Sequence, residues 1–160
     1  MTALKRISGL HHYAYRCRNA EETRSFYEDL LGLPLAHVIQ ADTVPSTGAF
    51  NPYVHLFFEY ADGSYIAFFD LGDETSCTPD PETPSWVNHF AMQVKTVAEV
   101  EEWKKRLEAA GIDVVGVTDH EFVKSVYFFD PNGIRLEITC EVIGESERQT
   151  HRDEAHAALK

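Results

Sequence analysis

Two histidines and one glutamate are placed in the sequence so that together they could hold a divalent metal ion. His12 and His89 each open a stretch of alternating residue character, and Glu137 lies in a similar stretch near the end of the chain. The neighbours Leu136 and Ile138 are apolar, so in a strand they would point away from the face that carries Glu137. Two imidazoles and a carboxylate form a facial ligand set that leaves coordination positions open on Fe(II), Mn(II) or a similar ion. These residue types predict a metal site.

Each of these residues also has a simpler interpretation. A histidine at the start of a strand is usually a surface residue or is satisfied by a neighbour, and a strand can carry a carboxylate on its solvent face. His11 competes with His12, and because neighbouring strand residues face opposite sides, only one of the two can be a ligand. Residue type and spacing alone leave the metal site and the surface interpretation both open.

An internal repeat favours the metal site. The segment from His12 to Glu22 aligns without a gap with the segment from His89 to Glu99, at an offset of 77 residues. The alignment matches His12 with His89, whereas His11 falls on an asparagine, so His12 is the predicted ligand. If the two copies pack about a pseudo-twofold axis, histidines at equivalent positions converge on a shared site.

Each copy predicts a strand, a helix and three further strands. Asn19 with Glu22, and Thr96 with Glu99, are typical of capping boxes that begin a helix. Apolar stripes follow both boxes, and each predicted helix ends at a glycine. The later strands are expected at residues 36–40, 54–60 and 65–71 in the first copy and 114–118, 125–130 and 134–139 in the second, with glycine in the hairpin turns.

The repeat defines the domain organisation. We expect one domain over residues 1–144, built from copies at about 8–71 and 86–142. Residues 72–85 are rich in Asp, Glu, Pro and Thr and are predicted to form a linker. Residues 145–160 form a polar tail, which is either a surface helix or without regular structure.

Charge and cysteine content narrow the possible partners. The formal net charge of -12 disfavours nucleic acid and anionic membranes as partners. No segment has the apolar length of a signal peptide or a membrane span. Cys17, Cys77 and Cys140 are scattered and odd in number, which fits neither a disulfide framework nor a thiolate zinc site. We therefore expect a cytoplasmic protein with a small-molecule substrate.

Three motifs resemble the vicinal oxygen chelate superfamily: the paired His-aromatic-Ala strand openings, residues 26–32, and residues 127–137. The resemblance implies an α+β fold in which two βαβββ modules form a cupped mixed sheet around one metal site, the glyoxalase/bleomycin resistance/dihydroxybiphenyl dioxygenase fold. It also implies that His12, His89 and Glu137 bind the metal. The superfamily covers glyoxalases, epimerases, fosfomycin-resistance transferases, bleomycin-sequestering proteins and extradiol catechol dioxygenases. Because its members pair or exchange modules between chains, a homodimer is expected.

The second copy further resembles the extradiol dioxygenase signature. The matching residues are Thr118 to His120, Val126-Tyr127, Asp130-Pro131, Gly133 and Glu137. In that subfamily the matching histidine and tyrosine lie beside the substrate, so the resemblance implies catalytic roles for His120 and Tyr127. It also implies Fe(II) as the metal, with Mn, Ni, Co or Zn as alternatives, and a small catechol-like substrate.

The sequence also departs from its relatives. Glyoxalase I uses a fourth ligand from the first copy, at a position that aligns here with Ala67 or Phe68, and neither can bind a metal. This favours the three-ligand pattern of dioxygenases and fosfomycin transferases. Many catechol dioxygenases have four modules rather than two and carry an acid-base histidine, for which His55 is the candidate in the first copy. The alignment of the copies does not settle whether His55 turns inward.

Two other functions remain open on the sequence. A lyase, isomerase or small-molecule transferase would use a non-redox metal as a Lewis acid, with Glu59 or Glu121 as the base. A ligand-sequestering protein without a metal would not need two histidines and a glutamate at these positions.

Overall fold

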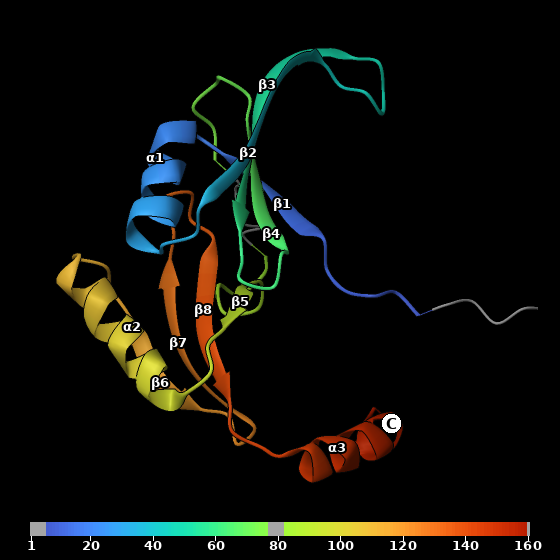
Figure 1. Cartoon of the computed structure of the whole chain (residues 1–160), viewed down its shortest axis with the longest axis vertical. Helices are drawn as coiled ribbons and strands as arrows, with labels where there is room; N and C mark the ends of the chain where they lie inside the picture. The colour runs from blue at the N-terminus through green and yellow to red at the C-terminus, as the bar shows by residue number, and fades with distance from the viewer. Residues whose placement is uncertain (1–5, 77–81, 160) are drawn as a thin grey trace, which may run out of the picture. The chain divides into compact units, whose positions relative to one another are not determined.

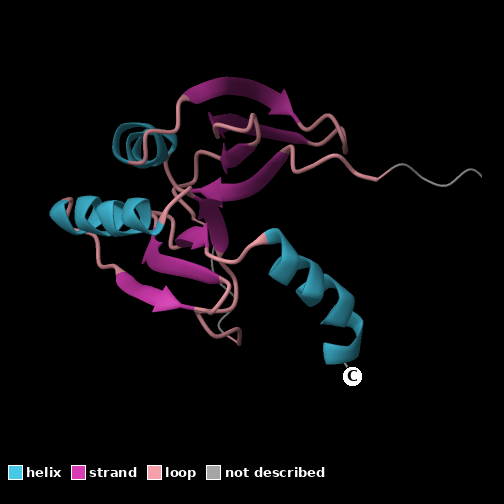
Figure 2. Cartoon of the chain, turned by 60° about the horizontal axis from the view of Figure 1, so that its bottom comes forward, coloured by secondary structure: helices cyan, strands magenta, loops and turns pink. Residues whose placement is uncertain are grey.

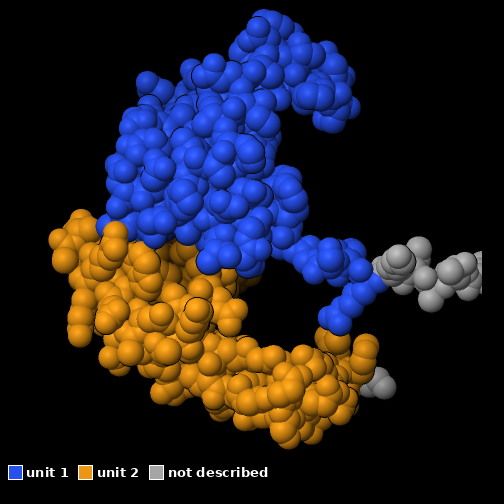
Figure 3. Space-filling view, viewed as in Figure 1, with its two compact units in different colours: residues 1–80, 131–133 blue, residues 81–130, 134–160 orange. Residues whose placement is uncertain are grey.

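The computed structural model describes residues 6–76 and 82–159 (Figure 1). Two compact units make up the chain, unit 1 with residues 1–80 and 131–133 and unit 2 with residues 81–130 and 134–160 (Figure 3). Each unit contains one four-stranded mixed sheet, and α1 in unit 1 and α2 in unit 2 contact strands of their own sheet. Figure 2 colours helices and strands differently. The predicted α+β fold of two βαβββ modules is confirmed.

Unit 1 is built on a sheet with the strand order β1-β4-β3-β2. Strand β1 runs parallel to β4, and the other neighbours are antiparallel. The elements are β1 (His12–Cys17), α1 (Ala20–Arg24), the π-helix η1 (Ser25–Leu30), β2 (Leu35–Thr43), β3 (Phe50–Glu59) and β4 (Tyr65–Asp70). Strand β2, predicted at residues 36–40, extends over nine residues.

The core of unit 1 lies between η1 and one face of this sheet. The ring of Tyr27 on η1 packs on Phe58 of β3 and Phe68 of β4, with centroid distances of 5.4 and 4.8 Å. All three side chains are fully buried, and burial of each large side chain contributes roughly 1.5–3 kcal/mol. Because strand residues alternate between faces, His12 and Phe57 lie on the opposite face of the sheet, away from this core.

Unit 2 repeats this order in a sheet β5-β8-β7-β6. Its elements are β5 (Phe90–Gln93), α2 (Val97–Ala109), β6 (Val115–Asp119), β7 (Val123–Phe129), β8 (Arg135–Glu141) and α3 (Glu145–Ala158). Val100 and Leu107 of α2 are fully buried, as are Val126 of β7 and Leu136 of β8. Helix α2 contacts β6, β7 and β8, so these four side chains form the core on one face of the sheet.

The predicted helix starts are confirmed, but the two capping boxes differ. At α2 the Thr96 side chain accepts a hydrogen bond from Glu99 N, and the Glu99 carboxylate accepts from Thr96 N. At α1 the Asn19 side chain accepts from Glu22 N, which is the first half of a box. The Glu22 carboxylate instead pairs with the Arg18 guanidinium, because a cationic donor is a stronger partner than a backbone N–H.

The C-terminal tail forms a helix. Of the two alternatives for the tail, the structure has the helix, α3, whose side chains include no buried residue. The linker is predicted at residues 72–85. Part of it, residues 77–81 with Cys77 among them, lies outside the described residues. Within the described residues, no helix is long and apolar enough to cross a membrane.

Candidate active site

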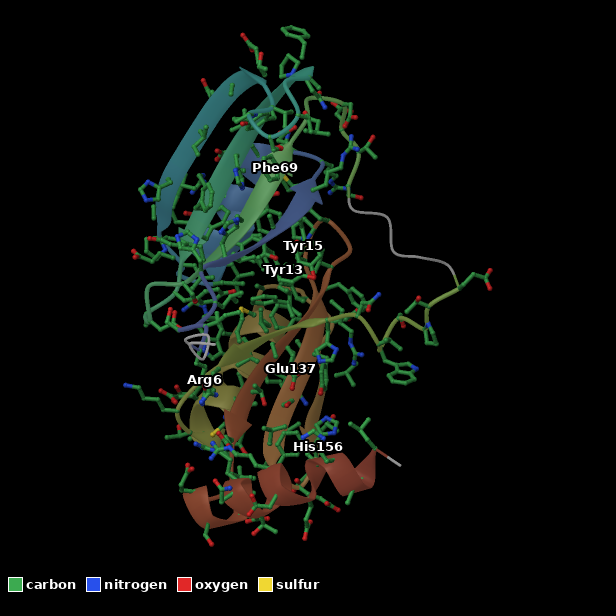
Figure 4. The ribbon with its side chains drawn as sticks, turned by 90° about the vertical axis from the view of Figure 1, so that its right-hand side faces the viewer. Arg6, Tyr13, Tyr15, Phe69, Glu137 and His156 are labelled. Carbon is green, nitrogen blue, oxygen red and sulfur yellow. The ribbon has the colours of Figure 1, made fainter. Side chains whose placement is uncertain are left out.

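Glu137 is a buried carboxylate on the sheet face that points away from the core of unit 2. It lies in the middle of β8 with only 5 % of its surface exposed (Figure 4). Leu136 and Ile138 on either side point into the core of unit 2, so alternation puts Glu137 on the other face, as predicted. A buried charge needs a close partner, because its desolvation costs free energy. That partner is His89, whose Nε2 lies 2.9 Å from Glu137 Oε2.

The hydrogen bond at the other ring nitrogen of His89 suits it to metal binding. His89 Nδ1 lies 3.1 Å from the Val87 carbonyl oxygen, which can only accept, so Nδ1 carries a proton. In the neutral ring Nε2 then presents a lone pair toward the Glu137 carboxylate. Two electron-rich atoms at this distance repel unless the ring gains a second proton or a cation binds both. The His89–Glu137 pair therefore has the donor chemistry of half a metal site.

Tyr127 and His120 form a second polar pair in unit 2. The Tyr127 hydroxyl and His120 Nε2 are 2.8 Å apart, and the Tyr127 ring lies 5.9 Å from the ring of His89. Tyr127 is directly opposite Glu137 in the β7–β8 register, so both lie on one face. Burial, followed by the negative charge of Glu137, raises the pKa of the Tyr127 hydroxyl, which favours its neutral, proton-donating form.

Arg135 belongs to the same face and was not singled out for a role by the sequence. Its guanidinium carbon lies 4.2 Å from the centroid of the Tyr127 ring, a cation–π arrangement. The alternation that placed Glu137 also placed Arg135 two residues earlier on the same face. That spacing was the available signal for Arg135, whereas its contact with Tyr127 depends on strand register.

The strand register confirms that the two copies are equivalent at the site. Glu137 pairs with Ala91 and Tyr127, and in unit 1 Ala67 pairs in the same way with Ala14 and Phe57. Ala67 therefore occupies the position equivalent to Glu137 and offers no ligand. His12 and His89 each stand two residues before the paired alanine of their copy, so they are equivalent too.

His12 lies in unit 1, at the start of β1, beside other aromatic rings. Its Nδ1 is 2.8 Å from Nδ1 of His11, and its ring centroid is 5.5 Å from that of Phe57. The ligand set of His12, His89 and Glu137 draws on both units and stays a prediction. Over residues 6–76 and 82–159, no group of three or more His, Cys, Asp or Glu side chains forms a metal site.

His55 turns inward, which the copy alignment left open. It lies on the same face of the unit 1 sheet as His12, with a ring-centroid distance of 6.4 Å, and is 8 % exposed. Its ring stacks on Phe69, labelled in Figure 4, at 3.6 Å. Burial, followed by the charge of His12, lowers the pKa of His55 to about 4, so the ring is neutral near pH 7. Among the described residues, Nε2 of His55 has no hydrogen-bond partner.

Comparison with known proteins now gives the family. The model of the Glyoxalase/Bleomycin resistance protein/Dioxygenase superfamily matches residues 9–138, most of the chain. The chain belongs to this superfamily. This glyoxalase-superfamily protein is similar to "Glyoxylase I 4" of Arabidopsis thaliana, with 27 % identity over an alignment of 172 residues. The alignment covers 96 % of this chain and 87 % of that relative.

Solved structures agree on the fold. A glyoxylase/bleomycin resistance protein/dioxygenase domain from Frankia sp. EAN1pec matches with a TM-score of 0.68 at 17 % identity, over 86 % of this chain and 100 % of that one. The fosfomycin resistance protein FosX from Listeria monocytogenes, in complex with Mn(II) and sulfate, matches with a TM-score of 0.62 at 23 % identity, over 90 % and 99 %. At these identities the matches establish the fold of this glyoxalase-superfamily protein, and one neighbour holds a divalent metal.

Proposed function

We propose that this glyoxalase-superfamily protein is a metal-dependent, extradiol-type ring-cleaving dioxygenase that acts on a small catechol-like substrate. The observation that carries the proposal is the arrangement of two polar pairs on one face of the unit 2 sheet, His89 with Glu137 and His120 with Tyr127. The first pair supplies metal donors, and the second supplies groups that can exchange a proton. A protein that only sequesters a ligand would need neither pair.

His12, His89 and Glu137 are the proposed metal ligands. The donor chemistry of the last two fits a divalent cation, because a buried carboxylate faces an imidazole nitrogen whose ring is held through its other nitrogen. We propose Fe(II) as the metal, with Mn, Ni, Co or Zn as alternatives. Bound Fe(II) supplies Lewis acidity toward two neighbouring substrate oxygens and reactivity with dioxygen.

Tyr127 and His120 are the proposed catalytic residues. The raised pKa of Tyr127 keeps its hydroxyl protonated, so it can donate a hydrogen bond to negative charge that develops on the substrate. His120 Nε2, 2.8 Å from that hydroxyl, can replace the proton when Tyr127 gives it up. Arg135 over the face of the Tyr127 ring helps to hold the ring in place.

His55 is the proposed hydrogen-bond acceptor on the unit 1 face. Its buried Nε2 has no partner among the described residues, and the stacked Phe69 ring restricts its orientation. An imidazole so placed beside His12 can accept the proton of a substrate hydroxyl that turns toward it. This supports a dioxygenase over a chemistry that needs no histidine at this position.

Metal analysis and oxygen uptake together test the proposal. The protein is purified anaerobically, its metal content is measured, and oxygen consumption is followed with a panel of catechols. We expect iron and catechol-dependent oxygen uptake, both lost in His89→Ala and kept in His151→Ala, which removes an exposed histidine of α3. Iron-loaded protein that consumes no oxygen with any catechol would overturn the proposal.

A second candidate is a lyase, isomerase or small-molecule transferase with a non-redox metal. The names of two relatives favour it, a glyoxylase I and a fosfomycin resistance protein with Mn(II). Of its two predicted bases, Glu59 lies opposite Tyr65 in the β3–β4 register, 3.5 Å from the Tyr65 hydroxyl, and Glu121 is exposed in the β6–β7 loop. Nickel, zinc or manganese in the purified protein, without oxygen uptake, would favour this candidate.

The proposed partners are a small-molecule substrate and a second copy of the chain, with no role for nucleic acid or membranes at a net charge of -12. A homodimer predicts twice the monomer mass of 18.1 kDa in light scattering, whereas the monomer mass would contradict it. A reducing compartment, the cytoplasm, is the proposed location because the cysteines are odd in number and dispersed.

A further inference from the structure

A cavity of about 340 Å³ lies in unit 1, within the size range of small-molecule sites. Segments that are distant in the sequence contribute to it, since its walls come from the residue before β1 and from three strands of the sheet. Its lining residues are His11, His37, Val38, Ile39, Phe57 and Tyr65. None of these side chains is acidic, in a chain whose net charge is -12.

The aromatic rings of the lining are spaced to receive another ring. The centroids of His37 and Phe57 are 6.2 Å apart, those of His37 and Tyr65 are 6.0 Å apart, and those of Phe57 and Tyr65 are 6.0 Å apart. The planes of Phe57 and Tyr65 are nearly perpendicular, at 89°. Such a set presents both faces and edges to the cavity, and aromatic pairs prefer tilted or edge-to-face contact at these distances.

Ile39 completes the apolar part of the wall, because it lies on the same face of β2 as His37, and it is 46 % exposed. Val38 between them lines the cavity from the strand itself, since its side chain points to the other face. Covering such exposed apolar surface with a planar apolar group is favourable, at roughly 25 cal/mol for each Å² removed from water. The cavity therefore suits a flat ring system better than a flexible polar chain.

His37 is the polar group of the lining whose hydrogen-bonding capacity is left for a ligand. His11 Nδ1 is already paired with His12, and the Tyr65 hydroxyl lies 3.5 Å from Glu59. Within the described part of the chain, neither ring nitrogen of His37 has a hydrogen-bond partner. An imidazole N–H that faces an aromatic cavity selects a ring that carries an oxygen acceptor.

We propose that this cavity binds an oxygen-bearing aromatic ring system, with His37 as the residue that selects for the oxygen. The cavity adjoins His12, because His11 and Phe57 both line the cavity and contact His12. If His12 binds the metal, as the proposed function has it, the bound ring is part of the molecule that reacts there or is attached to it. The substrate is then an oxygenated aromatic compound larger than catechol itself.

Binding to metal-free protein tests this inference separately from catalysis. The protein is stripped with a chelator, and affinities for naphthol, naphthalene and decahydronaphthol are measured by NMR titration. Aromatic contacts predict about three- to tenfold tighter binding of naphthol than of its saturated counterpart. His37→Phe keeps a ring but removes both nitrogens, so naphthol affinity should fall about three- to tenfold while naphthalene affinity stays the same.

Two variants of β2 locate the site. Ile39→Trp fills the cavity and should abolish binding of both aromatic probes, whereas Gln40→Trp, at an exposed neighbour that does not line the cavity, should leave binding unchanged. Equal affinity of wild type for naphthol and decahydronaphthol, or equal losses for naphthol and naphthalene in His37→Phe, would overturn the inference. Aromatic binding without catechol-dependent oxygen uptake would overturn the proposed function alone.

Discussion

Replacing Glu137 by glutamine tests whether this residue is a metal ligand. Glu137→Gln keeps the length and volume of the side chain and one carbonyl oxygen, but removes the charge. The side chain is 5 % exposed and its Oε2 lies 2.9 Å from His89 Nε2. The substitution should therefore separate the contribution of the carboxylate to the fold from its contribution to metal binding.

The effect on the fold should be small. A hydrogen bond between the His89 ring and a charged carboxylate contributes about 1.5–3 kcal/mol. In the variant the glutamine amide N–H can instead donate to Nε2 of the neutral ring, a hydrogen bond that contributes about 0.5–1.5 kcal/mol. The difference of about 1 kcal/mol is partly offset because the variant no longer buries a charge. For a chain of this length, 1 kcal/mol corresponds to a change in Tm of about 2–4 °C, so metal-free variant and wild type should unfold within about 4 °C of each other.

The effect on metal affinity should be large. Losing a residue that only orients a ligand typically weakens metal binding 10- to 100-fold, as a general order of magnitude. Loss of a direct carboxylate ligand should exceed this, with a Kd raised at least about 100-fold, or about 2.7 kcal/mol. Anaerobic titration with Fe(II) or Mn(II), and metal content after dialysis, measure the change.

Glu141→Gln is the matched control, since Glu141 lies on the same strand but pairs with Arg148. It should bind metal as the wild type does. If Glu137→Gln retains full metal stoichiometry and an unchanged Kd, Glu137 is not a ligand and the proposed site is wrong. If the metal-free variant loses more than about 10 °C in Tm, the charge supports the fold and the reasoning about its neutral replacement fails.

Three further predictions follow from other contacts of the described residues. Asn132→Ala should lower the free energy of unfolding by about 2–4 kcal/mol in urea, because its side chain is 3 % exposed and bonds a backbone N–H and the Thr23 hydroxyl; Asn51→Ala, at an exposed position, should change it little. Tyr127→Phe should lower kcat of oxygen uptake about 100-fold with metal content unchanged, and an unchanged kcat would exclude the proton-donor role. The pKa of His55 is about 4 in the folded protein and near 6.5 in the unfolded chain, so the unfolded chain binds more protons between these pH values. The free energy of unfolding of the metal-free protein should therefore fall by about 2 kcal/mol as pH falls from 6.5 to 4. His55→Phe should reduce this dependence of stability on pH, and an equal dependence in variant and wild type would contradict the prediction.

The sequence alone predicted the repeat and the order of the elements. These features have local causes: a capping residue begins a helix, alternation assigns a strand face, and a glycine with φ of +81° lies in the turn of both hairpins, at Gly63 and Gly133. The placement of Glu137 opposite its apolar neighbours follows from the same alternation. A local pattern does not, however, report how far two strands are shifted along one another.

Contacts that depend on strand register needed the tertiary structure. The bonds of His89 to Glu137 and of His120 to Tyr127 join segments 48 and 7 residues apart, and only the paired strands bring their atoms within hydrogen-bonding distance. Whether His55 faced His12 was undecided from the alignment of the copies, because its equivalent in the second copy is Ser125, which offers no parallel. The β3–β4 register answers it, since His55 pairs with Phe69.

Residue types and the repeat determined which side chains could do chemistry in this protein, because ligand character and strand alternation are properties of the local chain. The cavity beside His37 and the neutral state of His55 were decided by tertiary structure alone. Both depend on which apolar rings surround a polar group, and that environment is assembled from strands whose distance in sequence no periodicity encodes.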